Sequence, residues 1–172
     1  PRARGTMALK STSSPITVST EVNQGVLNTF EVVPVDLQLN PLDQEVFVVT
    51  AVKIDFIQHP LPLVGAASDL FTGEYKVSVC KSRPAAFQTI GDSNCIASSE
   101  LLCVSATDAG SNFISASMFE QNSGDSPPSQ LAYLDIIATD NFFIALDGIN
   151  TRANLVAAVR IHGYRAKADA AT

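Results

Sequence analysis

The chain has 172 residues, of which 46% are apolar and only 16% are charged, and its net charge at pH 7 is −6. This length suits one domain with a sizeable core, and the charged fraction lies well below the roughly 25% of ordinary globular chains. Because Ser, Thr, Asn, Gln and Ala must cover the surface, the composition favours a subunit that contacts other copies, or a shell or appendage protein, over a highly charged cytosolic enzyme.

The first segment, residues 1–14, is a short basic arm. It carries Arg2, Arg4 and Lys10 among Gly, Ser and Thr, and it has no hydrophobic signal region. We expect the arm to be flexible and to contact an anionic surface, either the phosphates of a nucleic acid or lipid headgroups. Three cations are too few to package a genome alone, because phosphate contacts scale with the number of cations. No apolar run in the sequence approaches the ~18 residues that span a bilayer.

Alternation of apolar and polar residues, the mark of half-buried strands, dominates the rest of the chain. Within residues 45–58, for example, Val52 and Ile54 oppose Lys53 and Asp55. Turn-rich pieces separate the alternating segments. The predicted strands are 16–22, 26–37, 45–58, 74–82, 95–106, 113–121, 131–146 and 154–165, with a break in the seventh near Thr139-Asp140.

Eight strands in a chain of this size predict an antiparallel sandwich, and the jelly roll fits best. In a jelly roll whose strands are lettered B to I, one sheet runs B-I-D-G and the other runs C-H-E-F. Strands I, D, H and E are then interior, and the segments at three of those places, 154–165, 45–58 and 131–146, are the most apolar long runs. An immunoglobulin-like sandwich is disfavoured, because the chain lacks Trp and the expected cysteine spacing. We therefore expect an all-β, eight-stranded jelly roll over 15–166 and a tail over 167–172.

The three cysteines, Cys80, Cys95 and Cys103, form an odd set without Cys-x-x-Cys spacing, so a zinc site is not expected. Each lies in or beside an apolar stretch, which favours buried free thiols. A bridge from Cys95 to either of the other two stays open as an alternative, because connectivity is not readable from sequence.

Charge is unevenly distributed along the chain. Between Arg83 and Arg152 there is no Lys or Arg, whereas eight Asp and Glu residues fall there. The simplest interpretation is a solvated acidic face. The alternative is a charge-polarised subunit with an acidic outer side.

The sequence contains no recognisable catalytic or cofactor motif. Its two histidines, His59 and His162, have no further ligand at metal spacing, and no nucleophile, phosphate-loop or dinucleotide motif occurs. Asp147-Gly148 predicts a turn between the last two strands and not a catalytic carboxylate. We therefore expect no enzymatic activity, no metal, no cofactor and no small-molecule substrate.

The final strand lies in ANLVAAVRIHGYRAKAD, residues 153–169, where apolar residues alternate with Arg160 and His162. We expect the apolar set to face the core, with Arg160 and His162 on the opposite face of a central strand. Arg165 and Lys167 follow, and we expect them to begin a tail that contacts a neighbouring subunit.

These features together resemble single-jelly-roll viral capsid proteins: an Arg-bearing start, eight alternating strands, low charge and a last strand ending VRIHGYRAKAD. The likeness is strongest to the small major capsid proteins of icosahedral archaeal and bacterial viruses, some of which have an internal membrane. It covers roughly residues 15–165 as an architecture, without a diagnostic motif. The resemblance implies a coat protein of the virion that self-assembles with copies of itself, and with other capsid proteins, into an icosahedral shell. The arm would then contact the genome or the internal membrane.

Two other classes of function stay open on the same fold. A carbohydrate-binding or adhesin-like module of a surface appendage normally presents exposed Trp or Tyr platforms. This chain has no Trp and three tyrosines, Tyr75, Tyr133 and Tyr164. A trimeric ligand like tumour necrosis factor should carry a signal or a membrane anchor, which the sequence does not show.

Overall fold

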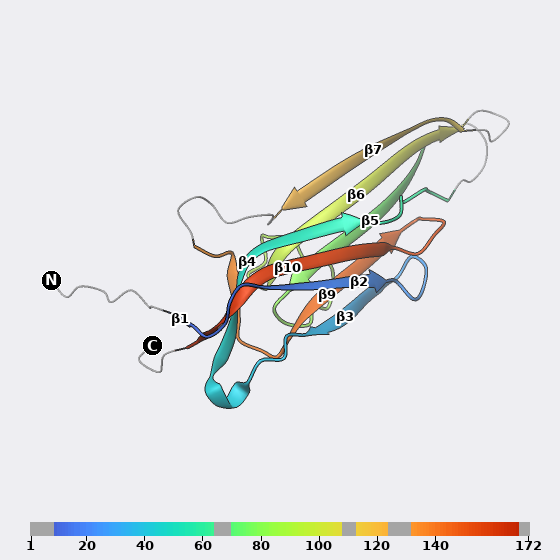
Figure 1. Ribbon diagram of the computed structural model, residues 1–172. Coiled ribbons are helices and arrows are strands. Elements are labelled where there is room, and N and C mark those ends of the chain that lie inside the picture. The colour runs from blue at the N-terminus through green and yellow to red at the C-terminus, as the bar shows by residue number, and fades with distance from the viewer. Residues whose placement is uncertain (1–8, 64–69, 108–112, 124–131, 169–172) are drawn as a thin grey trace.

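The computed structural model describes residues 9–63, 70–107, 113–123 and 132–168 (Figure 1). They form ten strands and one 3-10 turn (Pro41–Asp43). The strands are β1 (Lys10–Ser11), β2 (Ile16–Asn23), β3 (Phe30–Asp36), β4 (Glu45–Phe56), β5 (Leu70–Cys80), β6 (Cys95–Thr107), β7 (Phe113–Ser123), β8 (Asp135–Ile137), β9 (Asn141–Ile149) and β10 (Val156–Lys167). In this described part of the chain, no helix has the length and apolar character needed to span a bilayer.

The strand order is that of a jelly roll. One antiparallel sheet runs β2–β10–β4–β8, and the short β1 pairs with the far end of β10 on the same side as β2. The other sheet runs β3–β9–β5–β6–β7. Lettered B to I, the first sheet is B-I-D-G, and the first four strands of the second are C-H-E-F. The predicted all-β jelly-roll sandwich is therefore confirmed.

The three segments predicted to be interior strands are interior. They form β10, β4 and β9, each of which has a neighbour on both sides. The seventh predicted segment does break, and its two halves enter different sheets as β8 and β9. Because of this break, the seventh predicted segment supplies both strand G and strand H of the jelly roll. Strand G is the three-residue β8, whereas the segment predicted over 113–121 is the extra strand β7 at the outer edge of the C-H-E-F sheet.

The predicted turn at Asp147-Gly148 is wrong. Both residues lie within β9 and pair with β5. The chain turns after the strand, where Asn150 adopts a left-handed backbone conformation with φ of 53°. The glycine at 148 leaves room for the buried Gln24 side chain, since a Cβ there would lie 2.9 Å from its Oε1.

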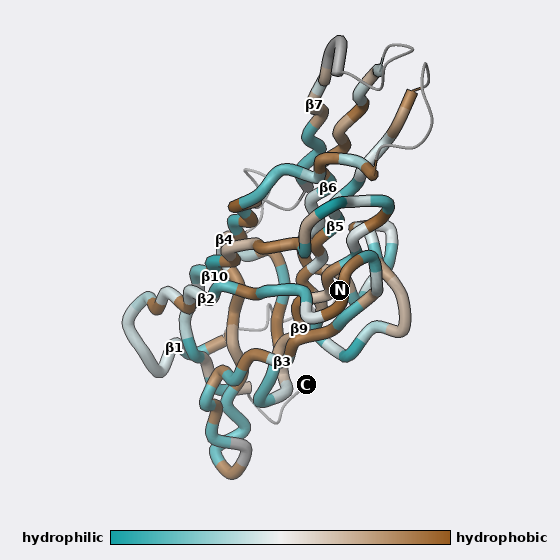
Figure 2. Tube along the Cα trace, turned by 90° about the vertical axis from the view of Figure 1, so that its right-hand side faces the viewer, coloured by the Kyte–Doolittle hydropathy of each residue, from teal (hydrophilic) through white to brown (hydrophobic). Residues whose placement is uncertain are grey.

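The core lies between the two sheets, and hydrophobic residues recur along β4, β9 and β10 (Figure 2). It forms because successive side chains of a strand point to opposite faces, so that one apolar set from each sheet meets the other. The largest fully buried apolar side chains are Tyr75, Phe47, Phe142, Ile137, Ile144, Leu146, Leu155 and Ile161.

An irregularity between His162 and Gly163 shifts the register of β10 against β4. On one side of it Val52 of β4 faces the core, and on the other side Phe47 does. On the Phe47 side of the irregularity, the residues of β4 and β10 that alternate with the core-facing ones point outward. They form a second, smaller cluster with buried Val46, Val48 and Ala166, against which Leu9, Ile136, Tyr164 and Ala168 pack. The bulge therefore divides the outer face of the B-I-D-G sheet into a polar half and an apolar half.

The C-H-E-F sheet extends past the body of the sandwich at one end. In Figures 1 and 2 the start of β5, the end of β6 and the start of β7 reach beyond the other strands. Over the described residues of β7 from 116 to 122, every side chain is exposed. This projection gives the molecule a ribbon that its own second sheet does not cover.

Candidate assembly surfaces

Two of the predicted contact residues, Lys10 and Lys167, lie side by side. Lys10 of β1 is the register partner of Lys167 at the end of β10, and both are exposed. The Lys167 ammonium lies 3.9 Å from the Asp43 carboxylate. Arg2 and Arg4 lie outside the described residues. The division into arm, domain and tail, and the contact of the arm with an anionic surface, stay predictions.

Arg165 is half-buried in β10 and makes its contacts within the subunit. Its guanidinium Nη2 donates to the Leu37 carbonyl at 3.3 Å, and its backbone N–H donates to Ser13 Oγ at 2.9 Å. It lines a cavity of about 340 Å³ beside Asp36 and Phe47. The contact of Arg165 with a neighbouring subunit stays a prediction.

A polar patch covers one half of the outer face of the B-I-D-G sheet. It comprises Thr17, Ser19 and Glu21 of β2, Ala158, Arg160 and His162 of β10, and Ala51, Lys53 and Asp55 of β4. The outward orientation predicted for Arg160 and His162 is confirmed, because Val159 and Ile161, which alternate with them, are buried. The ring Nδ1 of His162 lies 3.0 Å from Thr17 Oγ1, which ties β10 to β2.

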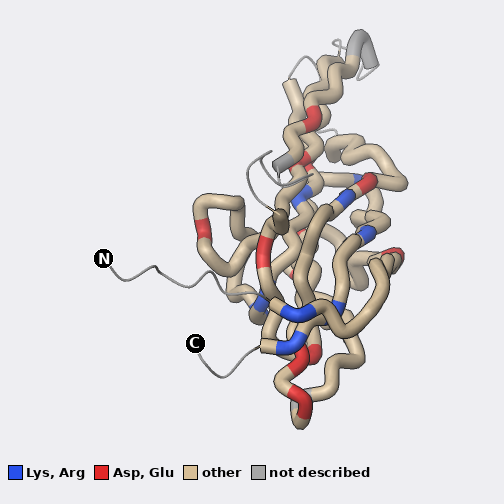
Figure 3. Tube along the Cα trace, turned by 60° about the vertical axis from the view of Figure 1, so that its left-hand side comes forward, with Lys and Arg blue, Asp and Glu red and all other residues tan. Residues whose placement is uncertain are grey.

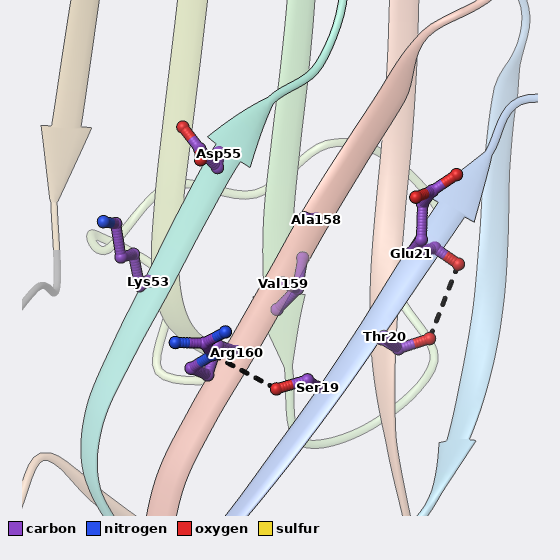
Figure 4. Close-up of a pocket in the computed structure, with 8 residues that line it drawn as sticks. All are labelled: Ser19, Thr20, Glu21, Lys53, Asp55, Ala158, Val159 and Arg160. Carbon is purple, nitrogen blue, oxygen red and sulfur yellow. Dashed lines mark hydrogen bonds between the residues drawn. The ribbon is translucent and has the colours of Figure 1, made fainter.

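The charges in the polar patch are sorted into two rows (Figure 4). In the basic row, Lys53 and Arg160 are register partners, and Arg160 Nε donates to Ser19 Oγ at 3.2 Å. The acidic row lies two residues away from the basic row. There Asp55 of β4 and Glu21 of β2 are the register partners of Ala158, one on each side of it. Lys53 and Arg160 are therefore like-charged neighbours, whereas Asp55 and Glu21 are separated by Ala158.

The signal for the acidic row was only partly visible in the sequence. Alternation along β4 predicts Lys53 and Asp55 on an outward face, and Glu21 alternates with the apolar residues of β2. Their arrangement around Ala158 depends on the register between strands far apart in the sequence, which the sequence alone does not specify.

Among the strands that the structure describes, β7 is an edge strand and pairs with β6 alone. It has 11 residues and contains no Pro, Lys or Arg, and its one acidic residue is Glu120. Phe119 and Met118 are 58% and 40% exposed on its opposite faces. Strands β6 and β7 each carry one acidic residue, Glu100 and Glu120, and no basic residue (Figure 3).

Two other edge strands, β3 and β8, are better protected than β7 against pairing with a second chain. The edge strand β3 contains Pro34, and β8 has three residues. Proline, short strands and charged side chains are the usual devices that prevent edge-to-edge association. The long and mostly uncharged β7 uses none of them apart from Glu120.

All three cysteines are free and buried, as predicted. Cys80 and Cys95 are register partners across β5 and β6. A hydrogen bond from the Cys95 thiol lowers the pKa of Cys80, whereas the same bond and burial raise the pKa of Cys95. Burial also raises the pKa of Cys103.

We expect these thiols to be protected in the native protein. Because a thiol reagent needs solvent access, Ellman's reagent should label none of Cys80, Cys95 and Cys103 at the rate of a denatured chain. The same protein in urea should release three equivalents. A native thiol that reacts as fast as in urea would contradict this prediction.

The tyrosines do not form a flat platform. Tyr75 is fully buried, and its hydroxyl donates to the Ala153 carbonyl at 2.6 Å. Tyr164 packs against the outer apolar cluster. Among the three, Tyr133 is the one that is exposed, at 39%.

Neither a protein-family model nor a curated protein sequence matches the chain. Among solved structures it is similar to VP1 of Trichodysplasia spinulosa-associated polyomavirus, with 9% identity, a TM-score of 0.44, and coverage of 95% of this chain and 100% of that one. For chimpanzee polyomavirus VP1 the identity is 7% and the TM-score is 0.43, and the match covers 95% of this chain and 100% of that one. For an unassembled KI polyomavirus VP1 pentamer the identity is 9% and the TM-score is 0.43, and the match covers 95% of this chain and 99% of that one. These TM-scores lie below 0.5, so the fold assignment depends on the strand order of this chain.

Proposed function

We propose that this protein is a structural coat subunit that self-assembles, through many copies, into the icosahedral shell of a virus. The observation that carries the proposal is the edge strand β7 with exposed apolar side chains on both faces. Fold alone does not establish function. The jelly-roll order of the two sheets is consistent with the proposal and does not carry it.

The edge of β7 favours association because none of the described strands pairs with the backbone N–H and C=O groups on its outer side. A strand or loop of a second copy that pairs with this edge would satisfy those groups. The same contact would remove Phe119 and Met118 from water, which stabilises association in proportion to the apolar area buried. A subunit with scarce surface charge loses little solvation in forming such contacts.

The carbohydrate-binding or adhesin-like alternative has less support in the geometry. An aromatic platform needs exposed rings, and the Tyr75 ring lies in the core. Association with other capsid proteins, contact of the arm with genome or an internal membrane, and the likeness to archaeal and bacterial capsid proteins belong to the proposal as predictions.

The proposal is tested by replacing Phe119 with lysine. Lysine adds a charge that must be desolvated when a second strand pairs with β7, so we expect the concentration needed for assembly to rise about tenfold or more. Light scattering and electron microscopy of wild type and variant measure assembly, and circular dichroism verifies that both are folded.

Leu42→Lys is the matched control. Leu42 is 93% exposed in the 3-10 turn, away from β7, so the same change of chemistry should leave assembly unaltered. Wild-type protein that stays monomeric at high concentration, across salt and pH, would overturn the coat function.

A further inference from the structure

We infer that the polar patch on the B-I-D-G sheet is a two-fold contact with a second copy of this chain. The inference deepens the proposed function and rests on it, because it names the partner that an assembling subunit would meet at this face. It is carried by the order of the charges and by the shape of the surface between them.

The charges are arranged at a cost to the isolated subunit. Like charges directly opposite one another on neighbouring strands are destabilising, and Lys53 and Arg160 are such partners. Alternating the signs along the rows would have paired each cation with a carboxylate on the next strand. The sorted rows instead give the patch a positive side and a negative side.

The charged groups are available to a partner. Glu21, Lys53, Asp55 and Arg160 are all exposed, and within the described ranges none of the four forms an ion pair with another. The guanidinium of Arg160 uses Nε for Ser19. Arg160 is exposed, and a bidentate contact of its guanidinium with a carboxylate is the geometry that arginine prefers.

The surface is hollowed where the acidic row crosses β10. Ala158 is small and stands between the longer Asp55 and Glu21 (Figure 4). A hollow of about 290 Å³ lies over this part of the sheet and is lined by both rows. A cationic side chain entering over Ala158 would meet a carboxylate on each side.

A second copy supplies that cation under one symmetry. Rows two residues apart are separated by about 6.8 Å along the strands. Consider two patches that face each other across a two-fold axis. If the axis runs parallel to the rows and lies midway between the basic row and the acidic row, it places each basic row over the acidic row of the other copy. Arg160 of one copy then lies over Ala158 of its partner, and Lys53 lies over Asp55. A two-fold axis along the strands would oppose like charges, so the pattern selects the first arrangement.

The test uses two complementary charge reversals of the full chain. Lys53→Glu with Arg160→Glu makes the patch wholly acidic, and Glu21→Lys with Asp55→Lys makes it wholly basic. Sedimentation velocity at low ionic strength should show that each variant alone self-associates about tenfold or more weakly than wild type. An equimolar mixture should restore association to the wild-type level, and so should one chain that carries all four changes.

Net charge is controlled by Asp140→Lys with Thr89→Lys and Ser93→Lys, which together change the charge as much as the basic variant does but at exposed positions outside the patch. This control should associate as wild type does. If the reversed variants assemble as wild type does, or if mixing them restores nothing, the two-fold contact is overturned while the coat function stands. If wild type itself never associates, both are overturned.

Discussion

Replacing Gly163 by alanine should destabilise the native state by about 3 kcal/mol, the upper end of the usual range for overpacking. Gly163 lies at the bulge where β10 shifts register against β4. A Cβ at this position would lie 2.2 Å from the Val48 carbonyl oxygen and 2.6 Å from the Phe47 ring. The carbonyl belongs to a central strand and cannot move without breaking pairing, so the strain cannot be relieved by a side-chain rotation.

Urea unfolding followed by circular dichroism measures this loss, since the chain has no Trp. Gly91→Ala is the matched control, because a Cβ there would meet only Thr89 Oγ1 at 3.6 Å. We expect the control to lie within about 0.5 kcal/mol of wild type. An unfolding midpoint for Gly163→Ala equal to that of wild type would show that the two central strands do not approach as described.

Replacing Gln24 by leucine should cost about 2–3 kcal/mol, although the side chain is 1% exposed and leucine is the more apolar residue. The Gln24 amide donates through Nε2 to the Thr29 carbonyl and accepts through Oε1 the backbone N–H of Leu155 at 3.1 Å. Leucine leaves both backbone groups without these partners. Because an unsatisfied buried polar group costs its full desolvation penalty, the loss exceeds any gain from added apolar surface.

The same urea experiment checks this prediction. Gln58→Leu, at an exposed position after β4, should change the free energy of unfolding by less than about 0.5 kcal/mol. Equal stability of wild type and Gln24→Leu would mean that water or another group replaces the amide. The result also bears on Gly148, whose missing side chain makes room for this amide.

The strand pattern and the identity of the interior strands were predictable from the sequence. Alternation records which side chains are buried, and this is a local property that each segment carries by itself. The same reasoning placed Arg160 and His162 on the outward face of a central strand. The most apolar long runs of the sequence identified β4, β9 and β10 as interior, because strands with neighbours on both sides are the most buried.

Pairing and register could not be predicted in the same way. The segment 113–121 reads as a strand, but its place beside β6 and not at G depends on which partner it meets. Asp147-Gly148 reads as a turn, but a sheet register that extends β9 to Ile149 overrides the local preference. In both cases a contact between distant segments competes with a local signal and prevails.

The polar patch shows the same division. The sequence by itself determined that Glu21, Lys53, Asp55 and Arg160 point away from the core, because each alternates with buried apolar residues. Only the tertiary structure decided that Lys53 and Arg160 stand side by side and that Asp55 and Glu21 flank Ala158. The physical reason is that a shift of one residue between strands moves every side chain to the other face, and a shift of two exchanges the rows. That register is set by the bulge at Gly163 and the packed core, and not by any of the four charged residues.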